Sequence, residues 1–350
     1  MNTHKNLSVA ALVLGLLVVS LHGQQPAEQQ EADAFRFKSG VELINVTATV
    51  SDMSGRFVSG LTQDDFIVYE DDQRVEVTHF SSERVPVSLG IVLDTSGSMA
   101  GEKMEAARAA LNRFLAMLLD RQDEMFLYRF SNYPELIQEW SNDRQPFERA
   151  LDRAIPNGGT AMYDAIVEAV PMVASGQNRK KALLIVSDGR DTSSTASVME
   201  ARNLIRESEA LVYAVGIDCG SGDMRRRQFD PFPQRGPVPR PFPFPPGGRR
   251  PWPQPLPPQV PDRGWMRTCN DPVDVEALRD ITDSSGGRTE IIRQARDLDP
   301  ATAGIADELR KQYYLGYPAA GKKDGRWHSI RVEVRNQTYR VRARRGYIAS

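Results

Sequence analysis

The chain has 350 residues, 40% of them hydrophobic, and a formal net charge of -2. This length suits two domains, or one large domain with attachments, and the apolar fraction is sufficient for a sizeable core. A charge balance so close to neutral gives no electrostatic reason to expect a nucleic-acid partner.

The N-terminus has the layout of a secretory signal. Lys5 precedes an uncharged, largely apolar run at residues 7–21, and a polar, Gln-rich stretch follows. The run is shorter than the ~20 residues of a membrane span. We therefore predict a signal peptide at residues 1–23 and export of the body to the periplasm or the extracellular space. The alternative is an uncleaved N-terminal anchor, which would place the protein at a membrane. Residues 24–40 are polar and acidic and predict a flexible spacer.

Two short segments with β-type alternation lie near the two ends of the body. Residues 41–84 alternate apolar and polar side chains between turn-like sequences, which is typical of a small antiparallel β module. Residues 316–350 show the same alternation on either side of a turn and predict a β-hairpin. Neither segment is large enough for a core of its own. We therefore predict that the two segments pair in one sandwich-like module.

Between these segments, residues 85–315 alternate strand and helix patterns. Continuous apolar runs, such as residues 87–93 and 182–186, predict strands that are buried on both faces. Amphipathic stretches between such runs predict covering helices. The alternation predicts an α/β domain with a doubly wound, mostly parallel, Rossmann-like sheet that interrupts the β module.

The alternation is broken once, by a proline-rich segment at residues 229–262. Proline lacks a backbone donor, which excludes a helix or an inner strand, so we predict a disordered or polyproline II insertion. The only two cysteines, Cys219 and Cys269, bracket this segment. In an exported chain their placement favours a disulfide at the base of the insertion, and two unpaired thiols are the alternative.

Three loops with oxygen-bearing side chains are predicted at one edge of the sheet. DTSGS holds Asp94, Ser96 and Ser98, NGGT ends at Thr160, and SDGRDTSS holds Asp188 directly after a buried strand. Ligand sites of such sheets lie at the carboxyl ends of the strands, so we expect these side chains to meet. Two carboxylates and three hydroxyls suit Mg²⁺ or Mn²⁺, with some contacts through water. Each loop alone would be explained as a helix cap or an ordinary turn, so the prediction depends on the whole set.

The sequence DTSGS, then GGT, then a strand followed by SDG resembles the von Willebrand factor A (VWFA) domain with its metal-ion-dependent adhesion site. The resemblance covers roughly residues 87–315. It implies that the metal, Mg²⁺ in most members, is held by Asp94, Ser96, Ser98, Thr160 and Asp188. It also implies an open coordination position that a ligand protein fills with a Glu or Asp carboxylate. The flanking GLTQDDFIVYEDDQ, YYLGY and RARRGY are similar to an exported, VWFA-related group common in acidobacteria.

These observations favour a protein-binding or cell-adhesion module over an enzyme. Outside the predicted signal the histidines are His79 and His328, and both are expected to be exposed strand residues. No HExxH or GxSxG motif is present, and the two loop carboxylates are already assigned to the metal. The partner is predicted to be a protein of unknown identity. The alternatives are a structural part of an envelope complex, or a metal-dependent hydrolase that uses the same carboxylates.

Overall fold

A computed structural model describes residues 43–218, 273–319 and 324–349. These residues belong to one compact unit that begins at Leu43. The predicted signal peptide, spacer and proline-rich insertion, together with Cys219 and Cys269, lie outside the described residues, so these predictions stay predictions. Among the described residues, no helix has both the length and the apolar character that a membrane crossing needs.

The centre of the α/β part is a six-stranded sheet in the order β10-β9-β8-β5-β6-β7. All neighbouring strands are parallel except the edge pair β6 and β7. The strands are β5 (Val87–Asp94), β6 (Glu124–Phe130), β7 (Pro134–Ser141), β8 (Lys180–Ser187), β9 (Leu211–Ile217) and β10 (Thr289–Ile292). Every residue of β5 is buried, as the continuous apolar run predicts for a strand that is covered on both faces. The predicted doubly wound, mostly parallel sheet is confirmed.

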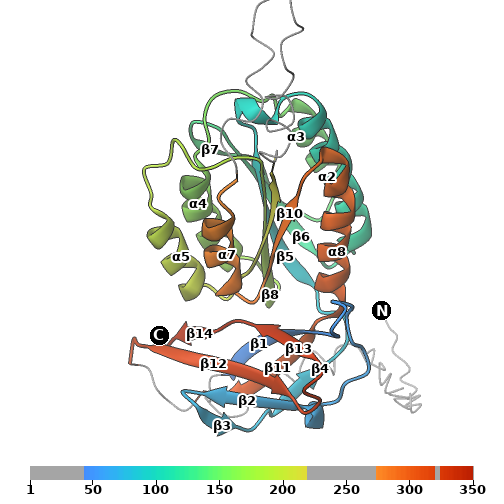
Figure 1. The fold of residues 1–350 in the computed structure, drawn as a ribbon, viewed down its shortest axis with the longest axis vertical. Coiled ribbons are helices and arrows are strands. Elements are labelled where there is room, and N and C mark those ends of the chain that lie inside the picture. Colours follow the sequence, from blue (N-terminus) through green and yellow to red (C-terminus); the bar gives the residue numbers. More distant parts are fainter. Residues whose placement is uncertain (1–42, 219–272, 320–323, 350) are drawn as a thin grey trace, which may run out of the picture. The chain divides into compact units, whose positions relative to one another are not determined.

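Helices cover both faces of this sheet (Figure 1). Alternate residues of β5 contribute to different cores, with Leu89 and Ile91 on one face and Val92 on the other. The first face packs against α2 (Glu102–Leu118), α3 (Arg144–Arg153) and α8 (Leu298–Lys311). The second face packs against α4 (Met162–Ala174), α5 (Val198–Glu207) and α7 (Val275–Asp283).

The remaining strands form two four-stranded antiparallel sheets with a shared core. Their orders are β13-β1-β11-β4 and β14-β12-β2-β3. Strands from the two ends of the body alternate in the first sheet, and in the second they meet where β12 pairs with β2. The strands are β1 (Leu43–Ser51), β2 (Phe66–Glu70), β3 (Gln73–Val75), β4 (His79–Ser81), β11 (Tyr313–Pro318), β12 (Trp327–Val334), β13 (Arg340–Ala343) and β14 (Gly346–Ile348). The predicted β module built from N- and C-terminal segments is confirmed. The predicted hairpin within residues 316–350 is wrong in its pairing, because β12 pairs with β2 and β14 whereas β13 pairs with β1 in the other sheet. Three short 3-10 turns complete the described elements: η1 (Gln63–Asp65), η2 (Gly97–Met99) and η4 (Ala295–Asp297).

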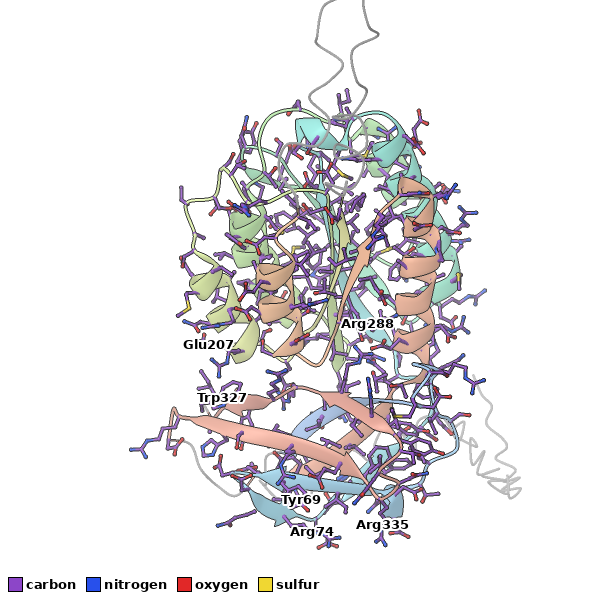
Figure 2. The ribbon with its side chains drawn as sticks, in the orientation of Figure 1. Tyr69, Arg74, Glu207, Arg288, Trp327 and Arg335 are labelled. Carbon is purple, nitrogen blue, oxygen red and sulfur yellow. The ribbon has the colours of Figure 1, made fainter. Side chains whose placement is uncertain are left out.

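A buried carboxylate on α8 connects the two parts of the fold. The Oε1 atom of Glu308 accepts hydrogen bonds from the hydroxyls of Thr49 on β1 (3.1 Å) and Tyr213 on β9 (3.0 Å). Its Oε2 atom pairs with Arg342 of β13 at 2.6 Å and with Arg288, labelled in Figure 2, at 3.0 Å. Buried polar groups are tolerated when such partners satisfy them, so this network fixes the last helix of the α/β part against the sandwich.

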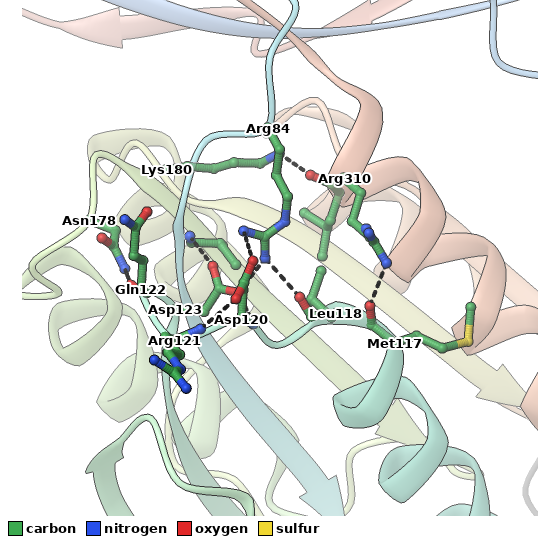
Figure 3. Close-up of polar contacts among 12 residues, drawn as sticks. Arg84, Met117, Leu118, Asp120, Arg121, Gln122, Asp123, Asn178, Lys180 and Arg310 are labelled. Carbon is green, nitrogen blue, oxygen red and sulfur yellow. Dashed lines mark hydrogen bonds and ion pairs between the residues drawn. The ribbon is translucent and has the colours of Figure 1, made fainter. Parts of the chain in front are cut away.

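A second polar junction holds the segment that leads from β4 into β5 (Figure 3). Arg84 donates to the Leu118 carbonyl at 2.8 Å and pairs with Asp123, whose other oxygen accepts the Val87 N–H at 2.9 Å. The nearby Lys180 ammonium donates to the Leu309 carbonyl. Burial lowers the pKa of Lys180 to about 7, against the opposing effect of the Glu308 charge.

We expect Glu308→Ala to lower the free energy of unfolding by about 2–4 kcal/mol, because it removes the buried carboxylate that accepts from Thr49 and Tyr213 and pairs with both arginines. Urea unfolding followed by circular dichroism measures this change. The matched control is Asp307→Ala on the same helix, where the lost partner is the half-exposed Lys311. The Asp307→Ala substitution should lower the free energy of unfolding by no more than about 0.5 kcal/mol. Equal losses for the two variants would contradict the assigned role of Glu308.

Candidate functional site

The five predicted oxygen ligands come from loops at the carboxyl ends of neighbouring strands. Asp94 is the last residue of β5, and Asp188 directly follows β8. These two strands are adjacent and parallel, with Leu93 opposite Val186, so their ends bring the two carboxylates to the same place. Ser96 and Ser98 lie in the turn between β5 and α2, and Thr160 lies just before α4.

Both carboxylates of the site are buried. Asp94 is 0% exposed, and Asp188 is 3% exposed. Asp94 Oδ1 accepts the Ser96 N–H at 2.7 Å, and its Oδ2 accepts the Ser187 hydroxyl at 2.5 Å. Burial, and then the charge of Asp188, raise the pKa of Asp94 to about 6. The two negatively charged carboxylates therefore lie close together with little water to screen them, and a bound cation would stabilise this arrangement.

The two serines of the turn link the carboxylates into one network. The hydroxyl oxygens of Ser96 and Ser98 are 3.0 Å apart, and Ser98 donates to Asp188 Oδ1 at 2.7 Å. The structure therefore brings Asp94, Ser96, Ser98 and Asp188 together. This oxygen-only donor set, with two carboxylates, fits Mg²⁺ or Mn²⁺ and would be a poor site for zinc.

Thr160 lies beside this network without being bonded to it. A Cβ atom on Gly189 would lie 3.6 Å from the Thr160 hydroxyl, so this hydroxyl faces the residue after Asp188. The backbone carbonyl of Thr160 accepts the N–H groups of Thr192 (2.9 Å) and Ser193 (3.2 Å). Within the described part of the chain, no hydrogen bond joins the Thr160 hydroxyl to the other four predicted ligands.

Backbone contacts fasten the loops of the site to one another. Thr95 donates to the Phe130 carbonyl and accepts from Asn157, each at 2.8 Å. Gly97 donates to the Gly158 carbonyl at 3.0 Å. Asn132, which the sequence analysis did not single out, accepts the Gly159 N–H at 2.7 Å. The loops after β5 and β6 and the loop before α4 are therefore held as one surface.

Lys103 is a site residue that the sequence analysis missed. Its Nζ atom lies 2.5 Å from Asp188 Oδ2, and its side chain is 16% exposed. It is the second residue of α2, where a cation opposes the helix dipole. A lysine at this unfavourable helix position, close behind the DTSGS turn, is the signal that could have identified it.

A second group of ionisable side chains lies in the sandwich. Ligand-type atoms of Glu70, Asp71 and His328 are within 4.8 Å of one another. The His328 Nδ1 atom is 2.7 Å from Asp71, and its Nε2 atom is 3.1 Å from Asp324. Both ring nitrogens thus contact carboxylates. We interpret the group as one that stabilises the β2–β3 turn, in which Asp71 has a φ of 48°.

The expectation that His328 is an exposed strand residue is wrong. His328 is 4% exposed and lies on the same buried face of β12 as Ile330. The hydrogen bond to Asp71, followed by that to Asp324, raises the pKa of His328 against the opposing effect of burial.

The comparisons with known proteins cover the part of the chain that holds the candidate site. A family profile described as the von Willebrand factor type A domain matches residues 89–190, which include all five predicted ligands. An uncharacterized protein of Synechocystis sp. is 26% identical over 111 residues, covering 31% of this chain and 26% of that protein. Inter alpha-trypsin inhibitor, heavy chain 4, of Mus musculus is 27% identical over 150 residues, which cover 38% of this chain and 16% of that protein. The chain therefore spans well under two thirds of both relatives.

A similar solved structure is that of von Willebrand factor type A from Catenulispora acidiphila. It is 13% identical, with a TM-score of 0.47, and the similarity covers 90% of this chain and 74% of that one. None of these comparisons tests the resemblance to the acidobacterial group, which stays a prediction.

We expect Asp94→Asn to raise the melting temperature in EDTA at about pH 8, because it removes a charge that is buried beside Asp188. The gain should be on the order of 1–3 kcal/mol of unfolding free energy. The control is Asp164→Asn, where the carboxylate accepts the N–H groups of Thr195 and Ala196. Since that carboxylate is only partly buried and accepts these N–H groups, with no buried carboxylate beside it among the residues that the structure describes, its loss should lower the melting temperature. A destabilised Asp94→Asn protein would contradict this account of the site.

We expect the sandwich to lose stability as the pH rises through the raised pKa of His328. The folded state holds the His328 proton more tightly than the unfolded chain, whose histidine pKa is about 6.5, so the stabilisation is complete only below that pH. Glu70, Asp71, Asp324 and Tyr347 are the groups that face this ring. Melting temperatures from about pH 5 to 9 should fall for the wild type and should be flatter for His328→Gln. His79→Gln is the control, and an unchanged slope in His328→Gln would refute the prediction.

Proposed function

The chain carries a von Willebrand factor type A domain at residues 89–190, and we propose that it is an exported, metal-dependent protein-binding module. The match to this family favours a role in protein interaction and adhesion over catalysis. The proposed ligand set is Asp94, Ser96, Ser98, Thr160 and Asp188, and the proposed ion is Mg²⁺ or Mn²⁺. The proposed partner is a protein that offers a Glu or Asp carboxylate, captured at the cell surface or in the periplasm.

The observation that carries this proposal is the burial of two carboxylates at one sheet edge, with serine hydroxyls between them. Asp94 and Asp188 are nearly inaccessible to solvent, yet the Asp94 pKa is raised partly by the charge of its neighbour. A fold whose only task was stability would gain from replacing one of these carboxylates. The presence of both carboxylates at this buried position supports a site for a positively charged ligand.

The chain's own residues would hold and orient the bound ion. Ser96 and Ser187 hold the Asp94 carboxylate from two directions, and Ser98 holds Asp188. The backbone contacts among the surrounding loops keep these oxygens in place before the ion arrives, which limits the ordering cost of binding. The ion would supply a positive charge that attracts an incoming carboxylate.

Export is proposed from the signal-like sequence at residues 1–23.

We expect purified protein to bind Mn²⁺ at one site, and we expect Asp94→Ala and Asp188→Ala to weaken this binding at least about tenfold, because each removes a ligand carboxylate. Isothermal titration measures the affinity. Glu105→Ala, at an exposed position of α2, is the control that should bind as the wild type does.

The same proteins, immobilised and exposed to an envelope extract, test the role of the ion in partner binding. The proposal requires a protein that is retained with Mg²⁺ and lost both with EDTA and with Asp94→Ala. A partner retained equally in all three conditions would refute metal-mediated binding. If chelation lowered the melting temperature but left capture intact, the ion would be structural and the chain would be a scaffold component.

A further inference from the structure

We propose that Lys103 is a built-in competitor for the divalent cation, occupying Asp188 until an ion displaces it. The proposal rests on the proposed function, since it concerns the same site. In this proposal, the Lys103 side chain of α2 sets the concentration of Mg²⁺ or Mn²⁺ at which the site fills.

The first argument is the occupation of Asp188 by protein donors. Its Oδ1 atom accepts the Ser98 hydroxyl at 2.7 Å, and its Oδ2 atom pairs with the Lys103 ammonium at 2.5 Å. The Asp188 side chain is 0% exposed, and that of Lys103 is 16% exposed. A cation that used Oδ2 would therefore have to replace the ammonium, not a water molecule.

The second argument is the location of Lys103 on its helix. The first turn of α2 also contains Glu102 and Glu105, and acidic residues are favoured at this end of a helix while cations are disfavoured. The pairing with Asp188 is a contact that offsets this cost. Lys103 is therefore held in place by the site rather than by the helix.

The third argument is the charge of the site. Asp94 and Asp188 contribute two negative charges, and the Lys103 ammonium neutralises one of them. If a divalent cation bound while Lys103 remained, three positive charges would lie against two negative ones with little water to screen them. The lysine has a flexible four-carbon stem and partial exposure, so it can move to solvent when the ion binds.

Titration of the full chain with Mn²⁺ tests the competition. Lys103→Met keeps the length and apolar stem of the side chain without its charge, and we expect it to bind Mn²⁺ at least about tenfold more tightly than the wild type. Lys103→Gln is a second neutral variant that should change the affinity in the same direction. In EDTA the neutral variants should melt at lower temperature, and the rise in melting temperature on adding Mn²⁺ should exceed that of the wild type. Lys311→Met, whose lysine pairs with Asp307 near the end of α8, is the matched control.

Chemical labelling of the wild-type protein tests the displacement itself. An acylating reagent should modify Lys103 slowly while its ammonium pairs with Asp188, and faster when Mg²⁺ is added, as read by peptide mass spectrometry. In Asp94→Ala, where the ion is not held, Mg²⁺ should not change the labelling of Lys103. Labelling of the wild type that does not respond to Mg²⁺ would overturn the proposal.

The outcomes separate this inference from the proposed function. If Lys103→Met and Lys103→Gln bind Mn²⁺ no more tightly than the wild type, while Asp94→Ala loses binding, the metal site stands and the competitor role of Lys103 fails. If no variant, including the wild type, binds Mn²⁺, both the metal site and the role of Lys103 fail.

Discussion

The parallel pairing of β5 with β8 is the constraint from which the site follows. Because these strands are neighbours in register, the residues at their carboxyl ends, Asp94 and Asp188, must lie close together. Helices on both faces of the sheet keep water away from this edge of the two central strands. The protein therefore holds two like charges where little water can screen them, and several neighbouring side chains offset their repulsion. Ser187 and Ser98 donate hydrogen bonds to the carboxylates, and Lys103 adds a positive charge.

The site and the sandwich depend on each other through the helices of the first sheet face. The loop after β5 leads into α2, which carries Lys103 and packs against α8. The helix α8 carries Glu308, whose carboxylate is satisfied from β1, β9 and β13. Each helix of this pair thus carries one charged side chain, Lys103 or Glu308, whose ionic partners are distant in sequence. Such polar centres specify the packing of the elements that supply their partners.

Much of this arrangement could be predicted from residue patterns. The apolar runs that became β5 and β8, followed by Asp94 and Asp188, were sufficient to place the carboxylates together, since parallel strands end at a common edge. The shortage of core in each terminal segment was sufficient to predict that they pair. Lys103 escaped prediction because its contact depends on how α2 packs over the loop after β8. His328 was misplaced although the signal was present, since the alternation that buries Ile330 also buries His328.

The order of the strands in the sandwich has a consequence for how the chain acquires its structure. β1 pairs with β11, and β2 pairs with β12, so strands from the start of the described chain require partners from its end. During synthesis from the N-terminus, β1 remains without its partner strands, and β2 can pair only with β3, until the whole α/β domain has been made. Contacts so distant in sequence are slow to form, and open strand edges invite pairing with other chains in the meantime. The α/β domain therefore folds first, and closure of the sandwich is the last step, joining the two ends of the body around a domain that is already complete.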